Sequence, residues 1–319
     1  MAALSTPLTL QTAVTSWRFD LPSSILVVLV VGIYLVGLRR STVPSSRAVP
    51  VLIGAAVWLI AGCGFVGVYS DVLFWVRALQ VVLLLMVVPF CLALGMPGTM
   101  ARDIVGHAAF DRVLGSKPAR VLASPATTSA GIIVTPWLIY LTGWYPAMLQ
   151  SGAVDTLTRL LLVICGAGYF YTRLQLDPVP RRYPQSMSLL ITLGETLGDG
   201  VLGVVMWQGG LLAASYYEAL HRVWGPSLRT DQTIGAGVFW ILGDALGLPF
   251  LLVLFSRFRA DERLRAEAAD AELDAAELKA AELAAAEPIP RAGEGAIDSA
   301  SGSTTLWWES HPELRDRFR

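Results

Sequence analysis

Residues 72–94 read VLFWVRALQVVLLLMVVPFCLAL, an apolar stretch interrupted by one arginine, Arg77, and one glutamine, Gln80. A helix needs about 20 apolar residues to cross the hydrocarbon core of a bilayer, so this stretch predicts a membrane span. Six other stretches have the same character. The seven expected spans are residues 23–38, 48–68, 72–94, 126–145, 157–171, 187–216 and 233–255. The sequence therefore predicts an all-α, polytopic membrane protein.

The composition supports this fold class. The chain has 319 residues, of which 54% are hydrophobic and 15% are charged, whereas about a quarter of the residues in soluble domains are charged. No basic stripe typical of nucleic-acid binding is present in the sequence. Cys63, Cys91 and Cys165 all fall inside expected spans, where small buried packing residues are the favoured interpretation. We expect the bilayer, and not nucleic acid, as the general partner.

The basic residues between the spans predict the orientation. Lys and Arg concentrate in cytoplasmic loops of membrane proteins, and here they concentrate in the segments after the first, third, fifth and seventh spans. These residues are Arg39, Arg40, Arg47, Arg102, Arg112, Lys117, Arg120, Arg173, Arg181, Arg182, Arg257, Arg259, Arg263 and Arg265. We therefore expect a multi-pass protein of the cell membrane with its N-terminus outside and its C-terminus in the cytoplasm.

Changes in composition predict four segments. Residues 1–22 form an extracytoplasmic N-terminal segment and residues 23–258 the membrane domain. Residues 259–287 are rich in Ala, Glu, Leu and Arg and contain neither Gly nor Pro. This composition predicts a charged cytoplasmic helix. Residues 288–319 contain Pro, Gly, Ser and Thr and are expected to be disordered. The pattern does not assign a role to the acidic helix or to Trp307 and Trp308.

Ionisable side chains inside expected spans are the candidate functional residues, because each costs about 3 kcal/mol to insert at the centre of a bilayer. Glu195 and Asp199 are four residues apart and share one helical face, and Arg77 is the basic residue expected at their depth. We predict a polar pocket near the outer surface, serving either a function or only helix packing. Its expected members are Arg77, Gln80, Asp155, Glu195, Asp199, Asp231 and Gln232.

Enzymatic chemistry is not indicated. The sequence has no serine elbow, P-loop or HExxH motif, and its three histidines, His107, His221 and His311, lie in loops or the tail. They have no spacing suited to one metal site. The residues themselves therefore predict neither catalysis nor a bound cofactor.

Three motifs resemble those of the CtaG-type cytochrome c oxidase assembly factors, and in particular an actinobacterial branch of that family. VPFCLALGMP at residues 88–97 is similar to the end of the family's third span. LDPVPRRYP at residues 176–184 resembles its cytoplasmic DPxPRRxP loop, and DQTIGAGVFWILGD at residues 231–244 resembles its DQxxGGxxxWxxGE motif. The resemblance covers residues 17–266 and implies a role in assembling haem-copper oxidase, with oxidase subunits as partners and copper as a cargo or ligand.

The resemblance also implies that this chain lacks several histidines that are typical of the family. The family opens its third span with an HMxxH pattern, and the matching positions here are Arg77 and Val81, with Gln80 between them. Further family histidines fall on Asp155 and Asp199. Copper prefers imidazole or sulfur donors, so we expect no metal at this place and interpret the exchange as charge compensation by guanidinium and carboxylate groups.

Three hypotheses follow. The first is assistance in oxidase assembly or copper handling, and the second is a metal-free paralogue that acts as a structural or interaction component of the membrane. The third and least favoured is a transporter with a protonatable path through Glu195, Asp199 and Asp244, because no symmetric pair of broken helices is visible in the sequence.

Overall fold

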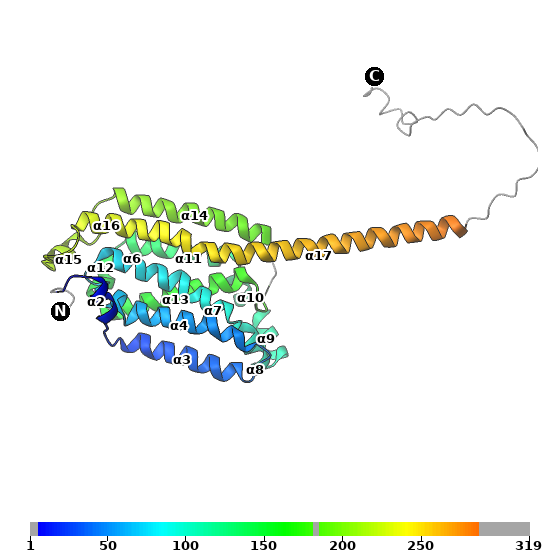
Figure 1. The fold of residues 1–319 in the computed structure, drawn as a ribbon, viewed down its shortest axis with the longest axis horizontal. Helices are drawn as coiled ribbons and strands as arrows, with labels where there is room; N and C mark the ends of the chain where they lie inside the picture. Colours follow the sequence, from blue (N-terminus) through cyan, green and yellow to red (C-terminus); the bar gives the residue numbers. More distant parts are fainter. Residues whose placement is uncertain (1–5, 181–184, 287–319) are drawn as a thin grey trace, which may run out of the picture. The chain divides into compact units, whose positions relative to one another are not determined.

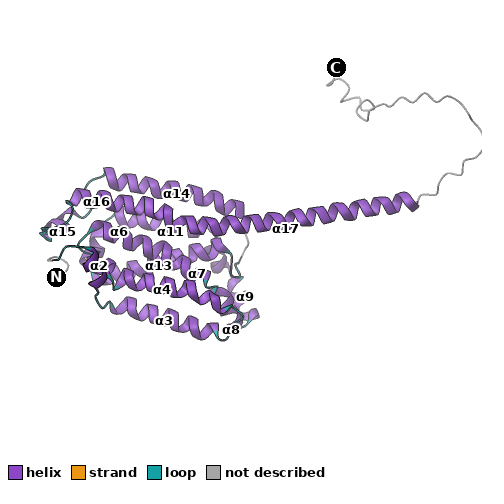
Figure 2. Cartoon of the chain, viewed as in Figure 1, coloured by secondary structure: helices purple, strands orange, loops and turns teal. Residues whose placement is uncertain are grey.

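The structure is a computed structural model that describes residues 6–180 and 185–286. Within these ranges every regular element is a helix and no strand is present (Figure 1; Figure 2). The prediction of an all-helical fold is confirmed for this part of the chain. The chain divides into two compact units, residues 1–263 and 264–319, and the helical bundle of the first unit holds all the sites discussed below.

The elements follow one another closely along the chain. In order they are α2 (Leu10–Thr15), α3 (Leu21–Leu38), η1 (Ser45–Arg47), α4 (Ala48–Gly62), α5 (Phe65–Tyr69), α6 (Phe74–Val82), η2 (Leu83–Val87), α7 (Val88–Leu94), α8 (Pro97–Val105), α9 (His107–Leu114), α10 (Lys117–Leu122), α11 (Pro125–Leu141), α12 (Trp144–Gln150), α13 (Gly152–Leu174), α14 (Gln185–Gln208), α15 (Ala214–Ala219), α16 (Leu228–Gly237), η3 (Val238–Leu242) and α17 (Gly243–Ala286).

Several of these helices can cross a membrane. Among the described residues, four helical stretches are long and apolar enough: Leu21–Leu38, Ser45–Tyr69, Phe74–Leu94 and Gly152–Leu174. A fifth candidate is the pair α11 and α12, which is bent by 73° at the residues between its two helices. The chain is therefore a membrane protein with four or five such helices in its described part.

Several of the expected spans have different limits in the structure; the fourth, expected at residues 126–145, is divided between α11, which ends at Leu141, and α12, which begins at Trp144. The fifth was expected at residues 157–171, but α13 begins at Gly152 and ends at Leu174, because its terminal charged residues are paired inside the bundle. The sixth was expected to reach Tyr216, but α14 ends at Gln208, directly before the pair Gly209 and Gly210, which are poor helix formers.

The residues expected to form the charged cytoplasmic helix belong to α17, which continues to Ala286. Its described side chains in the second unit are exposed. The expected tail, residues 288–319 with Trp307 and Trp308, lies outside the described residues.

The centre of the bundle is built around a proline in the third span. Pro89 has no N–H to donate to the carbonyl of Leu85, four residues earlier, and the helix widens there into the π-helical segment η2. Gly166 of α13 lies against this segment so closely that a Cβ at position 166 would stand 2.0 Å from the oxygen of Leu85. The absence of a side chain at Gly166 thus lets α13 pack directly on the widened turn.

The bundle has two ends, which we name after a buried residue at each. The Arg77 end contains the starts of α3, α6, α13 and α16, and the Asp177 end contains the starts of α4 and α8 and the end of α13 (Figure 1). At the Asp177 end, the carboxylate of Asp177 accepts hydrogen bonds from the backbone N–H groups of Gly98, at 2.9 Å, and Thr99, at 2.7 Å. It thereby caps the start of α8 from a distant loop.

A pair of glycines on α13 offers a test of this packing. We expect Gly166→Ala to lower the melting temperature of the purified protein in detergent, because its methyl group must displace backbone and overpacking costs about 1–3 kcal/mol. Gly168→Ala is the matched control, since its Cβ would meet Thr128 at an ordinary 3.9 Å and alanine favours a helix. Equal melting temperatures for the two variants would contradict the close approach.

Candidate functional site

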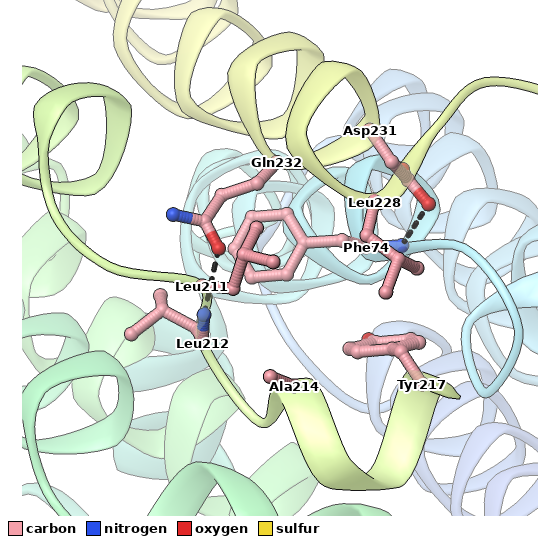
Figure 3. Close-up of a pocket in the computed structure, with 8 residues that line it drawn as sticks. All are labelled: Phe74, Leu211, Leu212, Ala214, Tyr217, Leu228, Asp231 and Gln232. Carbon is pink, nitrogen blue, oxygen red and sulfur yellow. Dashed lines mark hydrogen bonds between the residues drawn. The ribbon is translucent and has the colours of Figure 1, made fainter. Parts of the chain in front are cut away.

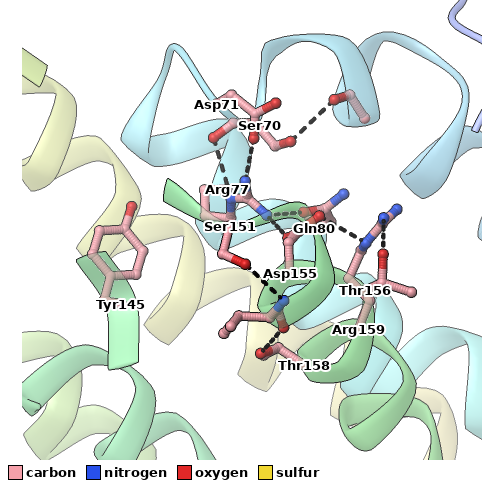
Figure 4. Close-up of polar contacts among 12 residues, drawn as sticks. Ser70, Asp71, Arg77, Gln80, Tyr145, Ser151, Asp155, Thr156, Thr158 and Arg159 are labelled. Atoms are coloured by element: carbon pink, nitrogen blue, oxygen red, sulfur yellow. Dashed lines mark hydrogen bonds and ion pairs between the residues drawn. The ribbon is translucent and has the colours of Figure 1, made fainter. Parts of the chain in front are cut away.

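Arg77 is the centre of the polar site at the Arg77 end. It lies on the first turn of α6, and its side chain has no exposed surface. Its Nη1 donates to Asp155 Oδ1 at 2.5 Å and to Gln80 Oε1 at 2.9 Å, and its Nε donates to the carbonyl oxygen of Ser70 at 3.2 Å. Its Nη2 pairs with Asp71. The buried guanidinium is thus neutralised by two carboxylates from different elements (Figure 4).

The pairing continues on both sides of Arg77. On α13, Nε of Arg159 lies 3.1 Å from Asp155 Oδ2, and Nη1 of Arg159 lies 3.1 Å from Asp20 Oδ2. On the other side, Nη1 of Arg18 lies 3.0 Å from Asp71 Oδ2. Charges therefore alternate along one chain of contacts, which we call the Arg77 network: Arg18, Asp71, Arg77, Asp155, Arg159 and Asp20.

Three guanidinium and three carboxylate groups leave the Arg77 network without net charge. An isolated charge at this depth would cost several kcal/mol of desolvation, and a paired, hydrogen-bonded charge recovers much of it. Gln80 extends the contacts, because its Nε2 donates to the carbonyl oxygen of Ala61 at 2.6 Å. The network consequently joins the start of α3, the end of α4, α6 and α13.

A polar cavity of about 410 Å³ opens beside the network. It exposes the edges of Arg18 and Asp71, which are 37% and 39% exposed, while Arg77 stays behind them. The cavity therefore presents both signs of charge to a binding partner. Its lining consists of Arg18, Phe19, Asp20, Asp71, Met148, Leu149, Gln150, Gly152, Asp155, Thr156, Arg159 and Tyr216.

Aromatic side chains close the other side of Arg77. The hydroxyl groups of Tyr145 and Tyr217 lie 2.7 Å apart, and the rings of Phe74 and Tyr140 pack against the ring of Tyr145 at centroid distances of 5.6 and 5.3 Å. All four side chains are buried. The guanidinium thus lies between a polar cavity and an aromatic wall.

Asp231 and Gln232 hold helix ends beside the aromatic wall (Figure 3). Asp231 accepts from the N–H groups of Phe74, at 3.2 Å, and Trp75, at 3.0 Å, and so caps the N-terminus of α6, where a negative charge is favourable. Gln232 accepts from Leu212 N at 2.7 Å. Its Nε2 also donates to the carbonyl oxygen of Met206, in the last turn of α14, and to that of Gly210, just after the helix.

The cavity drawn in Figure 3 is small. Its volume is about 10 Å³, which is close to the least space that one water molecule requires. We therefore interpret Asp231 and Gln232 as helix anchors that position α6, and with it Arg77, and not as ligands of a substrate.

Glu195 lies away from the Arg77 network, which corrects the expectation from sequence. Its Oε1 lies 3.0 Å from Nη2 of Arg173, and its Oε2 accepts from the hydroxyl of Tyr169 at 2.5 Å. Asp155 and Arg173 are 18 positions apart on α13, about 27 Å at 1.5 Å per residue. Glu195 therefore pairs near the Asp177 end. The side chain of Asp199 lies outside the described residues.

The expected pocket residues lie at different places in the bundle. The structure brings Arg77, Gln80 and Asp155 into contact, places Asp231 and Gln232 one layer away, and adds Asp20 and Asp71, which the sequence reasoning missed. Asp20 is at the N-cap position, directly before a helix that has proline in its first turn. This is a typical signal of a helix start, and it could have identified Asp20 from the sequence. Asp71 had no comparable signal.

The fold and the site together define a class of protein. It is a helical membrane bundle with a buried, neutral network of arginine and aspartate at one end. A family model described as "Cytochrome c oxidase caa3 assembly factor" matches residues 32–261. This match covers most of the chain. The chain therefore belongs to the cytochrome c oxidase caa3 assembly factor family.

Curated relatives come from mycobacteria. The chain is 24% identical over 288 residues to the uncharacterized protein Mb0105 of Mycobacterium bovis and to the uncharacterized protein MT0111 of Mycobacterium tuberculosis, covering 85% of this chain and 43% of each relative. It is 24% identical over 257 residues to the uncharacterized protein ML1998 of Mycobacterium leprae, covering 75% of this chain and 38% of the relative. These relatives support the actinobacterial branch. The chain spans about two fifths of their length, and no solved structure matches it.

The charge alternation predicts coupling between Arg77 and Asp155. Either single variant, Arg77→Leu or Asp155→Leu, leaves unbalanced buried charge and should destabilise the protein by about 3–5 kcal/mol. The double variant leaves two complete pairs, Arg18 with Asp71 and Arg159 with Asp20, so it should cost at least about 1 kcal/mol less than the sum of the singles. Denaturant titration in detergent micelles measures this, and strictly additive losses would contradict a shared pair.

Asp20 predicts a pH dependence. Burial raises the pKa of Asp20, but the hydrogen bonds that Arg159 and Ser23 donate to its carboxylate outweigh this effect and lower the pKa below its usual value. Its ionised form therefore stabilises the fold above about pH 4, and this contribution is lost as the pH falls through the lowered pKa.

Asn can also cap a helix, so Asp20→Asn removes mainly the charge. We expect this variant to melt about 4–8 °C lower at pH 7, the effect of losing roughly 2 kcal/mol of charged hydrogen bonds, and the difference to shrink as the pH falls below about 4. Asp274→Asn, at an exposed position of α17, is the control for the change in net charge. A pH-independent difference would show that the charge of Asp20 is not the cause.

Proposed function

We propose that this chain assists the assembly of a haem-copper cytochrome oxidase as a multi-pass protein of the cell membrane. Family membership supports the general role. The sequence pattern supports seven spans with the N-terminus outside and the C-terminus in the cytoplasm, because basic residues concentrate in alternate loops. In this orientation the Arg77 network and its cavity lie on the extracytoplasmic side, and the Asp177 end lies on the cytoplasmic side.

The donor atoms at the Arg77 network do not fit copper. Both carboxylates beside Arg77 already accept from guanidinium groups, and Arg77 itself cannot ligate a metal. Copper requires imidazole, thiolate or thioether donors, and Met148 is the one sulfur-containing side chain that lines the cavity. Among the described residues, no group of three or more His, Cys, Asp or Glu side chains is arranged to hold a metal ion. We therefore assign no copper-transfer step to this site.

An interaction role follows from the same geometry. The observation that carries it is the neutral Arg77 network at the positions where the family resemblance places imidazoles, together with an open cavity that exposes Arg18 and Asp71. A cavity that exposes both signs of charge suits a polar segment of a partner protein, since complementary charges fix the register and orientation of the two proteins. We propose that an oxidase subunit docks there during assembly.

The transporter hypothesis gains no support from the geometry. Glu195 is paired with Arg173, whose position on α13 is about 27 Å along the helix from that of Asp155. A paired carboxylate near the opposite end does not extend the Arg77 network into a continuous path for protons.

The proposal predicts an effect on oxidase content. In a strain without this gene, haem-copper oxidase detected in reduced-minus-oxidised spectra of membranes should fall severalfold, and the wild-type gene should restore it. A gene carrying Arg18→Gln should restore less, because it removes the exposed positive charge of the cavity while the pair of Asp71 with Arg77 stays in place. Arg112→Gln, at an exposed position of α9, is the charge-change control.

Each outcome bears on a different part of the proposal. Unchanged oxidase content after deletion would contradict the assembly role. Full restoration by the gene carrying Arg18→Gln would contradict docking at the cavity. Stoichiometric copper in the purified wild-type protein, measured by inductively coupled plasma mass spectrometry, would contradict the metal-free mode while leaving the assembly role intact.

A further inference from the structure

An apolar groove of about 490 Å³ follows the outer face of α3. It lies away from the Arg77 network, on the half of α3 that leads to the Asp177 end. Its floor and walls are apolar except at one end, where the helix is followed by Arg40. The lining residues are Val28, Leu29, Gly32, Ile33, Val36, Gly37, Arg40 and Ile104.

The groove exists because α3 is peripheral and has glycine on its outer face. Only 22% of the apolar window of α3 is buried in the bundle, whereas the window of Phe74–Leu94 is 67% buried. A Cβ placed at Gly32 would meet no atom within 4 Å. Val28 and Ile33 on either side of Gly32 are 70% and 66% exposed. A shallow channel therefore runs between side chains that already face the surroundings of the bundle.

The length of the groove matches one leaflet of a bilayer. From Val28 to Leu38, the last residue of α3, the helix advances 10 positions, about 15 Å at the helical rise of 1.5 Å per residue. Half of the hydrocarbon core of a bilayer is about 15 Å thick. A partner helix would contact α3 over its whole length, but the groove is confined to the half nearest Arg40. Its extent therefore fits an acyl chain better than a second helix.

The polar end of the groove fits a negatively charged headgroup. Arg40 is exposed and, within the described part of the chain, no carboxylate pairs with it. The adjoining helices α8 and α9 contain exposed apolar residues, Ile104, Val105 and Val113, next to basic residues. This combination is typical of helices that lie in the membrane interface. Arg40 is thus placed where lipid phosphates occur.

We propose that this groove binds one anionic phospholipid, with an acyl chain along Gly32 and Ile33 and the phosphate at Arg40. The site is separate from the Arg77 network and does not depend on the role in oxidase assembly. The bound lipid covers the exposed face of α3 and fills the space between α3 and Ile104 of α8. It thereby supports the helix whose N-cap, Asp20, belongs to the Arg77 network.

Two variants test the two halves of the site. Gly32→Leu places a large apolar side chain in the channel at a position where a Cβ meets nothing within 4 Å, and Gly237→Leu, where the same holds, is its matched control. Arg40→Gln removes the charge at the headgroup end, and Arg112→Gln makes the same change at an exposed arginine that does not line the groove.

The full-length protein, purified in detergent and stripped of lipid, is titrated with phosphatidylglycerol or phosphatidylcholine of identical acyl chains, and bound lipid is counted by native mass spectrometry. Wild-type protein should bind one phosphatidylglycerol with about fivefold preference, the advantage that one basic residue gives near a surface. Arg40→Gln should lose the preference, and Gly32→Leu should lose most binding of both lipids. Both controls should behave as wild type.

Other results would overturn the proposal. Equal binding of the two lipids by wild-type protein would remove the anionic specificity. Wild-type lipid binding by Gly32→Leu would show that the chain does not occupy the groove. A wild-type dimer that Gly32→Leu converts to a monomer, with no specific lipid bound to either, would assign the groove to a second copy of this chain.

Discussion

The buried guanidinium of Arg77 is the constraint on which the arrangement of the helices depends. A positive charge without exposed surface must be compensated within hydrogen-bond reach, and Arg77 finds its carboxylates on α13 and on the turn before α6. Because Asp155 in turn faces Arg159, and Arg159 faces Asp20, one charge fixes the relative positions of three helix starts. Apolar packing alone would not specify them, since lipid solvates apolar helix faces as well as a neighbouring helix does.

The three motifs that mark the family are anchors of helix ends in this structure. Asp177, from the loop motif, caps α8 directly after the Gly-Met-Pro that ends the third span, so two motifs distant in sequence form one contact. Asp231 caps α6 and Gln232 holds the end of α14. Gly235 follows on α16, where a Cβ would approach the ring of Phe74 to 2.4 Å. These residues determine where backbone ends meet, which explains their spacing without any ligand.

The sequence predicted the helical class and named Arg77 and Asp155 as members of one polar pocket, because long apolar runs and rare intramembrane charges are strong local signals. It failed for Glu195, since the i, i+4 relation to Asp199 shows a shared face but not the depth of the partner. Arg173 was assigned to a cytoplasmic loop, yet it is buried on the last turn of α13 and pairs with Glu195. Asp71 was missed because a turn residue beside a span gives no sign that its side chain folds back toward Arg77.

The alternation of charge explains how this bundle can join its helices at positions where the family resemblance implies imidazoles. A metal held by imidazoles would join helices through one cation and several neutral donors. A guanidinium on α6 and a carboxylate on α13 link these two helices by an ion pair without net charge. Such a link forms as soon as the chain folds, because both partners are covalently part of it, and it does not vary with metal supply. In the function that we propose, this pair holds the helices together, and the exposed edge of the network, at Arg18 and Asp71, is the part that a partner contacts.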